Sequence, residues 1–261
     1  LRLCHDTYAA AFGPRRFFIS RGRNPGSRND AVAGDHRKLM QLTPELLGPV
    51  LVWILWGVAA VVLALSFSYA ALASLWHSPA RQHLVLGSTV ALIVLWSVRA
   101  TVDPGVGLHV LGMTAAVLIL GWRFAVWAGL AAELAVSAAG SLSLGMVGPN
   151  WILAAVIPAT VTAIVARAVR RGLPPNLFIF IFAVCFFGAG GAVLSTHLVV
   201  AGLLGVAGVP GIQGVGESLL AFLPLVVFPE AFINGAVMSL LVVFRPDWVR
   251  LFDDRWYLDG R

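Results

Sequence analysis

Long apolar runs separated by short polar segments dominate the chain from residue 40 onward. Each run is long enough to cross about 30 Å of hydrocarbon or is shortened by Gly and Pro, so we interpret the runs as seven membrane spans. They lie near residues 48–75, 84–99, 108–121, 124–140, 151–167, 177–206 and 217–244. The pattern predicts an all-α, polytopic membrane protein with about seven transmembrane helices in one bundle.

The third and fourth runs are shorter than the others. Only Gly121, Trp122 and Arg123 separate them, which predicts a tight hinge. The two runs are therefore expected to form either a helical pair or a partly re-entrant element. Both alternatives are compatible with a site inside the membrane.

The composition agrees with a membrane protein and excludes other classes. Hydrophobic residues make up 59% of the chain and charged residues 11%, whereas charged residues approach about a quarter of a soluble domain. The net charge of +6 does not indicate nucleic acid, because eight of the eighteen basic residues lie in the first forty positions and the rest are scattered. Two cysteines, Cys4 and Cys185, are too few for a disulfide framework or a thiolate metal cage.

The polarity pattern divides the chain into three segments. Residues 1–39 form a basic leader, which is either a disordered arm or lies upstream of a true start at Met40. Residues 40–244 form the transmembrane domain, with the lipid bilayer as its surroundings. Residues 245–261 form an amphipathic tail, whose aromatic residues suit the membrane interface or a docking surface for a partner.

The arginines between the spans predict the orientation. With spans counted from Met40, nine arginines fall on one side of the membrane, and only Arg99 falls on the other. The nine are Arg81, Arg123, Arg167, Arg170, Arg171, Arg245, Arg250, Arg255 and Arg261. This predicts a multi-pass protein of the inner (plasma) membrane, with its N-terminus outside and its C-terminus in the cytoplasm. A basic cytoplasmic leader would conflict with that orientation, which favours a start at Met40.

Five ionisable side chains interrupt the apolar runs. Each costs about 2.5–3.5 kcal/mol on insertion scales, so each requires a partner, a watery cavity or a function. They are His109, Glu133, His197, Glu217 and Glu230. In the predicted orientation, His109, His197 and Glu217 converge on the extracytoplasmic side.

The two histidines are candidate metal ligands. His109 lies in GVGLHVLGM, with Met113 one turn further along, and imidazole suits nickel, cobalt, copper or zinc. It is a ligand or gate, or it forms a hydrogen bond to a neighbouring helix. His197 lies beside Ser195 and Thr196, and we favour a locally satisfied side chain for it.

The stretch FPEAFING places Glu230 and Asn234 on one helical face, directly after Pro229. Proline frees a backbone carbonyl, so the three residues predict a kinked polar notch inside a span. The notch either lines the path of a cation or bonds to another helix. Glu133 is expected to form a hydrogen bond to another helix rather than to bind a metal. The Gly/Pro-rich stretch with Met146 and Asn150 is expected to form a lid over a site on the outer side.

Sequence motifs of common enzymes are absent. The only lysine is Lys38, and there is no P-loop, G-x-S-x-G, H-E-x-x-H or Cys-x-x-Cys. We therefore predict no enzyme and no catalytic residues. The chain is expected to be a binder or conduit that is energised by another protein.

Two segments resemble a known family. They are GLHVLGMTAAVLILGWRFAVWAGLAAELAVSAAGSLSLGMVGPNWILAAVIPATV and FPEAFINGAVMSLLVVFRPDW. Their Gly-x-His-x-x-Gly start, Gly-Trp hinge, Gly-Pro-Asn loop and final Arg-Pro are similar to the CbiM/NikM-type substrate-binding subunits of energy-coupling factor transporters for cobalt and nickel. The similarity covers roughly residues 105–165 and 217–250.

The resemblance implies a seven-helix permease component that captures a divalent transition metal as its substrate, with no intrinsic cofactor. Its implied partners are a membrane coupling subunit and cytoplasmic ATPase subunits. His109 corresponds to the metal-binding histidine of the family. The family also uses an N-terminal Met-His pair, whereas Met40 is followed by Gln41 here. The remaining candidate ligands are His197, Met113, Met146 and Asp103.

Two other classes of function are alternatives to transport. A membrane scaffold or assembly factor for a metalloenzyme would use the same polar notch to hold a helix or a metal in transit. An intramembrane hydrolase would require a serine or paired acids near His109, and the sequence has no such spacing.

Overall fold

This computed structural model describes residues 44–98, 100–102, 106–108, 110–141, 144–208 and 212–252. Within these residues the chain is a helical bundle, so the predicted polytopic membrane fold is confirmed. One departure is a pair of short strands, β1 (Ala100–Val102) and β2 (Val106–Leu108), which pair antiparallel. The predicted leader 1–39 and the tail beyond 252 lie outside the described residues.

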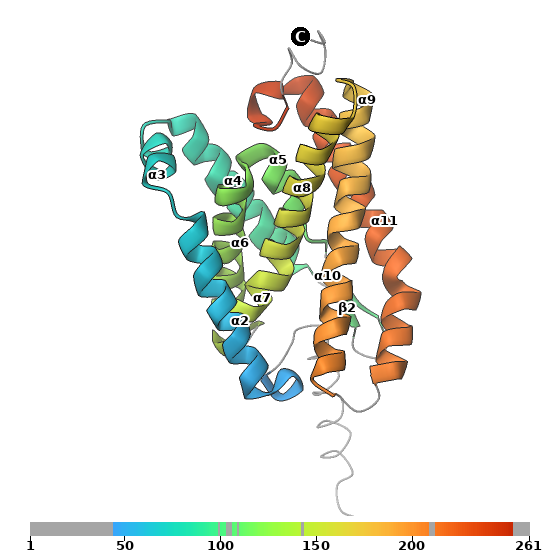
Figure 1. Ribbon diagram of the computed structural model, residues 1–261. Helices are drawn as coiled ribbons and strands as arrows, with labels where there is room; N and C mark the ends of the chain where they lie inside the picture. Colours follow the sequence, from blue (N-terminus) through green and yellow to red (C-terminus); the bar gives the residue numbers. More distant parts are fainter. Residues whose placement is uncertain are drawn as a thin grey trace, which may run out of the picture. The chain divides into compact units, whose positions relative to one another are not determined.

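The helices follow one another with short connections (Figure 1). They are α2 (Pro44–Ser66), α3 (Tyr69–Trp76), α4 (Pro79–Ser97), α5 (Met113–Leu120), α6 (Trp122–Val136), α7 (Val147–Trp151), α8 (Ile157–Gly172), α9 (Leu177–Ile179), α10 (Phe187–Val206) and α11 (Ile212–Phe244). Three π-helical turns extend them: η2 (Ser137–Ser141), η4 (Ile152–Val156) and η5 (Phe180–Phe186). Two 3-10 turns are η3 (Leu144–Met146) and η6 (Pro246–Trp248).

Four helical stretches of the described chain are long and apolar enough to cross a membrane. They are Leu47–Ser66, Leu144–Gly172, Leu177–Val206 and Leu223–Phe244. They match the first, fifth, sixth and seventh predicted runs. The helices α4, α5 and α6 correspond to the other three runs and fall short of this criterion.

Three boundaries differ from the predicted ones, each for a local reason. The first run breaks after Ser66, because Ser68 is extended and its side chain accepts the N–H of Ala71, which starts α3. The second helix begins at Pro79 rather than near residue 84, since proline suits the first helical position. The third helix begins at Met113, because residues 106–108 pair with β1.

The hinge between the third and fourth runs lies at Gly121, whose φ of +82° ends α5 and begins α6. With eight residues, α5 is only about 12 Å long, less than half the hydrocarbon thickness. The two helices pack against each other. They form a helical pair whose first member is too short to span a membrane.

Close helix contacts in the bundle depend on small residues. A Cβ atom added at Gly129 of α6 would lie 2.6 Å from the Cβ atom of Ala155, and one at Gly148 would lie 2.7 Å from the ring of Trp56. Because lipid is as apolar as the side chains, such close packing is a main source of helix association in membranes. The helices α10 and α11 also run side by side (Figure 1).

Candidate functional site

The short helix α5 contacts α4, α6, α8, α10 and α11, and six of its eight residues are buried. Glycines with positive φ bound it at both ends: Gly112 at +66° and Gly121 at +82°. Glycine adopts these angles without the steric cost that other residues meet. The chain can therefore turn into and out of a helix inside the bundle.

Two side chains of α11 cap the N-terminal end of α5. The carboxyl oxygens of Glu230 accept the N–H of Leu111 at 2.7 Å and the N–H of Gly112 at 2.8 Å. Asn234 Oδ1 accepts the N–H of Ala115 at 2.9 Å. The Asn234 amide in turn donates to Glu230 Oε1 at 2.9 Å and to the Glu230 carbonyl at 2.8 Å. The pair thus satisfies backbone donors that would otherwise be unpaired in an apolar interior.

Further bonds hold the start of α5 from other directions. The indole of Trp96, which is 1% exposed, donates to the Leu111 carbonyl at 2.9 Å. The hydroxyls of Thr114 and Thr162 lie 2.9 Å apart, joining α5 to α8. The backbone two residues after His109 is consequently fixed by α4 and α11 together.

The C-terminal end of α5 is held by the segment that follows α11. The N–H of Leu251 donates to the Leu118 carbonyl at 3.1 Å, and Arg250 Nη1 donates to the Leu120 carbonyl at 3.2 Å. We call Glu230, Asn234, Arg250 and Leu251 the α5 clamp. One stretch of chain, residues 230–251, therefore bonds to both ends of α5.

A second polar group lies between α6 and α7, where Glu133, Ser137 and Asn150 are all buried. The contacts of Gly129 with Ala155 and of Trp122 with Thr160 show that α6 runs antiparallel to η4 and α8. One turn further along α6 from Gly129 is Glu133, and about one turn back from Ala155 is Asn150 in α7. The antiparallel pairing therefore brings Glu133 and Asn150 to the same level of the bundle. Within the described residues, Asn150 Nδ2 and Ser137 Oγ have no hydrogen-bond partner.

The same polar group lies toward the N-terminal end of α5. The sulfur of Met113 lies 3.6 Å from the position that a Gly129 Cβ would occupy. Because α5 and α6 are joined by a tight turn, Leu111 and Gly112 lie nearest the end of α6 that carries Glu133. Two π-helical turns, η2 and η4, flank the group, and π-bulges are frequent at functional sites.

The structure places the other predicted side chains as follows. His197 Nδ1 is 2.9 Å from the Val193 carbonyl on its own helix, so the histidine is satisfied locally. Met113 and Met146 are both buried, in two different apolar clusters. Met146 and Asn150 are buried in helical turns rather than in a loop; the outer lid stays a prediction.

Three predicted residues cannot be placed. His109 and Asp103 lie outside the described residues, and so does the side chain of Glu217, although its backbone belongs to α11. Among the residues that are described, no three His, Cys, Asp or Glu side chains gather into a metal-binding group.

Sequence reasoning missed Trp96, Ser137, Arg250 and Leu251. Trp96 and Arg250 donate hydrogen bonds to distant backbone carbonyls, and Leu251 acts through its own backbone N–H, so no sequence spacing predicts these contacts. Ser137 carries a findable signal, because it lies four residues after Glu133 and so shares its helical face.

Comparison with known families identifies the chain. The model of the family described as "CbiM: Cobalt uptake substrate-specific transmembrane region" matches residues 42–248. The chain belongs to the CbiM family. The match spans α2 to η6 and includes the Glu230 cap and the Gly121 hinge. CbiM is a family of transporter components for cobalt uptake, not a family of enzymes.

Other comparisons add the fold alone. A solved structure entitled "Crystal Structure of an Truncated Transition metal Transporter" superimposes with a TM-score of 0.61 at 17% identity, covering 78% of this chain and 99% of that chain. At this identity the likeness supports the helical arrangement of this CbiM family member. A search among curated proteins found no match.

Proposed function

We propose that this chain is the substrate-binding membrane component of an energy-coupling factor type transporter that takes up a divalent transition metal, cobalt or nickel. The observation that carries the proposal is the CbiM family match over residues 42–248. In this proposal a membrane coupling subunit works with the chain, and ATPase subunits supply the ATP hydrolysis, for which the printed sequence has no P-loop.

His109 is the residue we propose as the metal ligand, with Glu133 and Asn150, toward the N-terminal end of α5, as further polar groups. His109 precedes by two residues the backbone that Glu230 and Trp96 fix. A ligand on a fixed backbone loses less entropy when it binds metal. The buried Asn150 amide and Ser137 hydroxyl supply polar groups at the same end of α5.

Glu230 is proposed to position the backbone at Leu111 and Gly112 and not to bind the metal itself. A carboxylate offers about four lone-pair sites, and three N–H groups already occupy sites on Glu230. That leaves about one site, so a cation could use more of the carboxylate only by displacing an N–H group of the α5 clamp. Glu230 therefore acts on the metal through the backbone that carries His109.

The test is uptake of cobalt and of nickel by cells that contain the complete transporter, measured by elemental mass spectrometry. His109→Ala is expected to abolish uptake, and Glu230→Gln to raise the metal concentration needed for half-maximal uptake. His197→Ala is the matched control and should retain uptake, because its imidazole already bonds to Val193. Normal uptake by His109→Ala would refute the proposed site.

Binding can be separated from transport in the purified chain. A ligand present at 100 times its Kd stabilises the folded state by about 2.7 kcal/mol. Cobalt or nickel should therefore raise the Tm of the wild type, and His109→Ala should lose this increase. Metal binding without uptake in any complete transporter would instead favour the scaffold or assembly-factor alternative.

The cytoplasmic position of the C-terminus is also a proposal, based on the arginine distribution. Cysteines introduced at Arg171 and at Leu144 should react with a membrane-impermeant maleimide from opposite sides. Leu144 is exposed, and the native Cys185 is buried. Labelling of both positions from outside would refute the orientation.

A further inference from the structure

A pocket opens near the C-terminal end of α5, the end opposite the one that Glu230 caps. Its volume is about 190 Å³. Half-buried apolar side chains form much of its wall, and arginines stand at its edge. The lining includes Leu84, Val85, Ile119, Phe124, Arg81 and Arg250.

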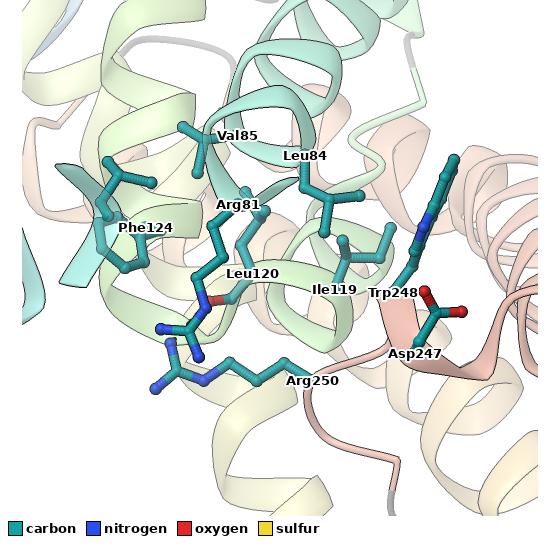
Figure 2. A pocket seen from close by; sticks show the side chains of 10 residues that line it. Arg81, Leu84, Val85, Ile119, Leu120, Phe124, Asp247, Trp248 and Arg250 are labelled. Atoms are coloured by element: carbon teal, nitrogen blue, oxygen red, sulfur yellow. Dashed lines mark hydrogen bonds between the residues drawn. The ribbon is translucent and has the colours of Figure 1, made fainter. Parts of the chain in front are cut away.

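The two arginines of this pocket, Arg81 and Arg250, face one another. Figure 2 shows their guanidinium groups pointing toward each other from α4 and from the segment after η6. Their hydrogen bonds go to neutral oxygens, those of Ser74 and Leu120. Among the described residues neither has an acidic partner, although Asp247 also lines the pocket. Two positive charges that line one pocket favour an anion between them.

Helix ends at the pocket add to its positive potential. Arg81 lies in the first turn of α4 and Phe124 in the first turn of α6, and neither helix has a side-chain cap. Uncapped first turns present backbone N–H groups and the positive end of the helix dipole, which suit an anion. The C-terminal end of α5 also lies at the pocket and carries the negative end of a helix dipole. Arg250 partly neutralises that negative potential, because it already donates to the Leu120 carbonyl.

The wall indicates what kind of molecule carries the anion. A free inorganic anion would gain nothing from Leu84, Ile119 and Phe124, whereas an amphiphile would bury an apolar part against them. Trp248 borders the pocket and is 41% exposed, with the Arg245 guanidinium 5.5 Å from its ring centroid. Tryptophan and arginine together are typical of the level of lipid headgroups.

We propose that this pocket binds the phosphate group of an anionic phospholipid. Arg81 and Arg250 would hold the phosphate oxygens, since guanidinium groups bind phosphate bidentately. The apolar wall would cover the start of the acyl chains. In the orientation proposed above the lipid belongs to the cytoplasmic leaflet, but binding itself depends on neither the orientation nor the metal.

The test is native mass spectrometry of the full-length chain in detergent, titrated with phosphatidylglycerol or phosphatidylcholine. Phosphatidylglycerol should be retained in preference. The double variant R81Q/R250Q should lose at least about tenfold in retention, because charge-assisted bonds are each worth at least that factor. R167Q/R171Q is the matched control, since it removes two exposed arginines of α8 that do not line the pocket.

A second arm separates the lipid from a free phosphate. Glycerol 3-phosphate carries the same phosphate without acyl chains, and a 100-fold excess should leave phosphatidylglycerol bound. Displacement by this excess would overturn the assignment to a lipid. Equal retention of the two lipids, or equal loss in R81Q/R250Q and in the control, would overturn the anion site.

The single variant R81Q distinguishes loss of lipid binding from misfolding of the double variant. The Arg81 side chain makes one exposed hydrogen bond of 3.4 Å within its neighbourhood, so its loss should leave the Tm unchanged. A folded R81Q protein that keeps the full preference for phosphatidylglycerol would count against the proposal.

Discussion

The two ends of α5 are held by the same stretch of chain but in different surroundings. At the N-terminal end, Glu230 and Asn234 are 2% and 1% exposed, and each bonds to backbone and to the other. At the C-terminal end, Arg250 is exposed and uses one of its donors on Leu120, next to an open pocket.

The difference shows how the same polar chemistry serves two purposes. In an apolar interior no water can replace a lost partner, so polar groups are retained where they satisfy one another. At a surface, water compensates a charge until a ligand arrives, and spare donors can remain available. The first end is therefore expected to govern the stability of the fold, and the second end to govern binding of the proposed phospholipid.

The largest effect is expected from Glu230→Ala. It leaves the N–H groups of Leu111 and Gly112 without their acceptor and removes a partner of Asn234. Each buried orphan group costs about 1–3 kcal/mol, so the free energy of unfolding should fall by roughly 3 kcal/mol or more. Denaturant titration of the purified protein measures this. Leu240→Ala on the exposed face of α11 is the control, and an equally small loss in both variants would show that the cap is unimportant.

Gly121→Ala tests the turn between α5 and α6, which joins the C-terminal end of α5 to the rest of the bundle. At φ +82° and ψ 160° the backbone occupies a region that is essentially restricted to glycine, and a side chain there costs on the order of 1–3 kcal/mol. The Tm should fall accordingly. Gly191→Ala in α10 is the matched control, because a Cβ there meets nothing within 4 Å; a similar Tm for the two variants would contradict the expected strain.

Asn234 variants test whether the cap depends on the direction of its hydrogen bonds. Asn234→Ala removes the acceptor of the Ala115 N–H, which should cost about 1–2 kcal/mol, as for other helix caps. Asn234→Asp keeps an acceptor but replaces the donor to Glu230 Oε1 by an oxygen at 2.9 Å. It should therefore be less stable than Asn234→Ala in the same thermal unfolding experiment. Wild-type stability of Asn234→Asp would exclude the assigned amide orientation.

The smallest effect is expected from Arg250→Ala. Its bond to the Leu120 carbonyl is long, at 3.2 Å, and only partly buried, so its loss should cost less than about 1 kcal/mol. Thermal unfolding beside Arg167→Ala provides the comparison. A loss as large as that of Glu230→Ala would mean that the two ends of α5 do not differ as proposed.

Several parts of this picture followed from sequence patterns alone. The apolar runs located the helices, and the Gly121 hinge was predicted from a Gly-Trp-Arg stretch between two short runs. The spacing of Glu230 and Asn234 predicted their shared face and mutual bond, which the structure confirms. Local composition and helical period were sufficient, because each of these features depends on residues within one or two turns of each other.

Boundaries and partners depended on longer-range contacts. The start of α4 at Pro79 follows from a proline at the first helical position, and the start of α5 at Met113 follows from strand pairing. A hydrophobic run reveals neither boundary. His197 could be judged from its own helix, but the partners of Glu230 lie 118 and 119 positions away. Nothing in the sequence near Glu230 names Leu111 or Gly112.

The apolar runs were sufficient to predict a membrane protein and the approximate positions of its helices. They also identified the few polar residues that need a hydrogen-bond or charge partner. The partners of these polar residues became visible only in the folded chain. The helix α11 caps the N-terminal end of α5, and the segment after α11 bonds to the C-terminal end of α5. The physical reason is that hydrophobicity acts locally along the chain, whereas a buried carboxyl group is satisfied only by donors that folding brings within about 3 Å.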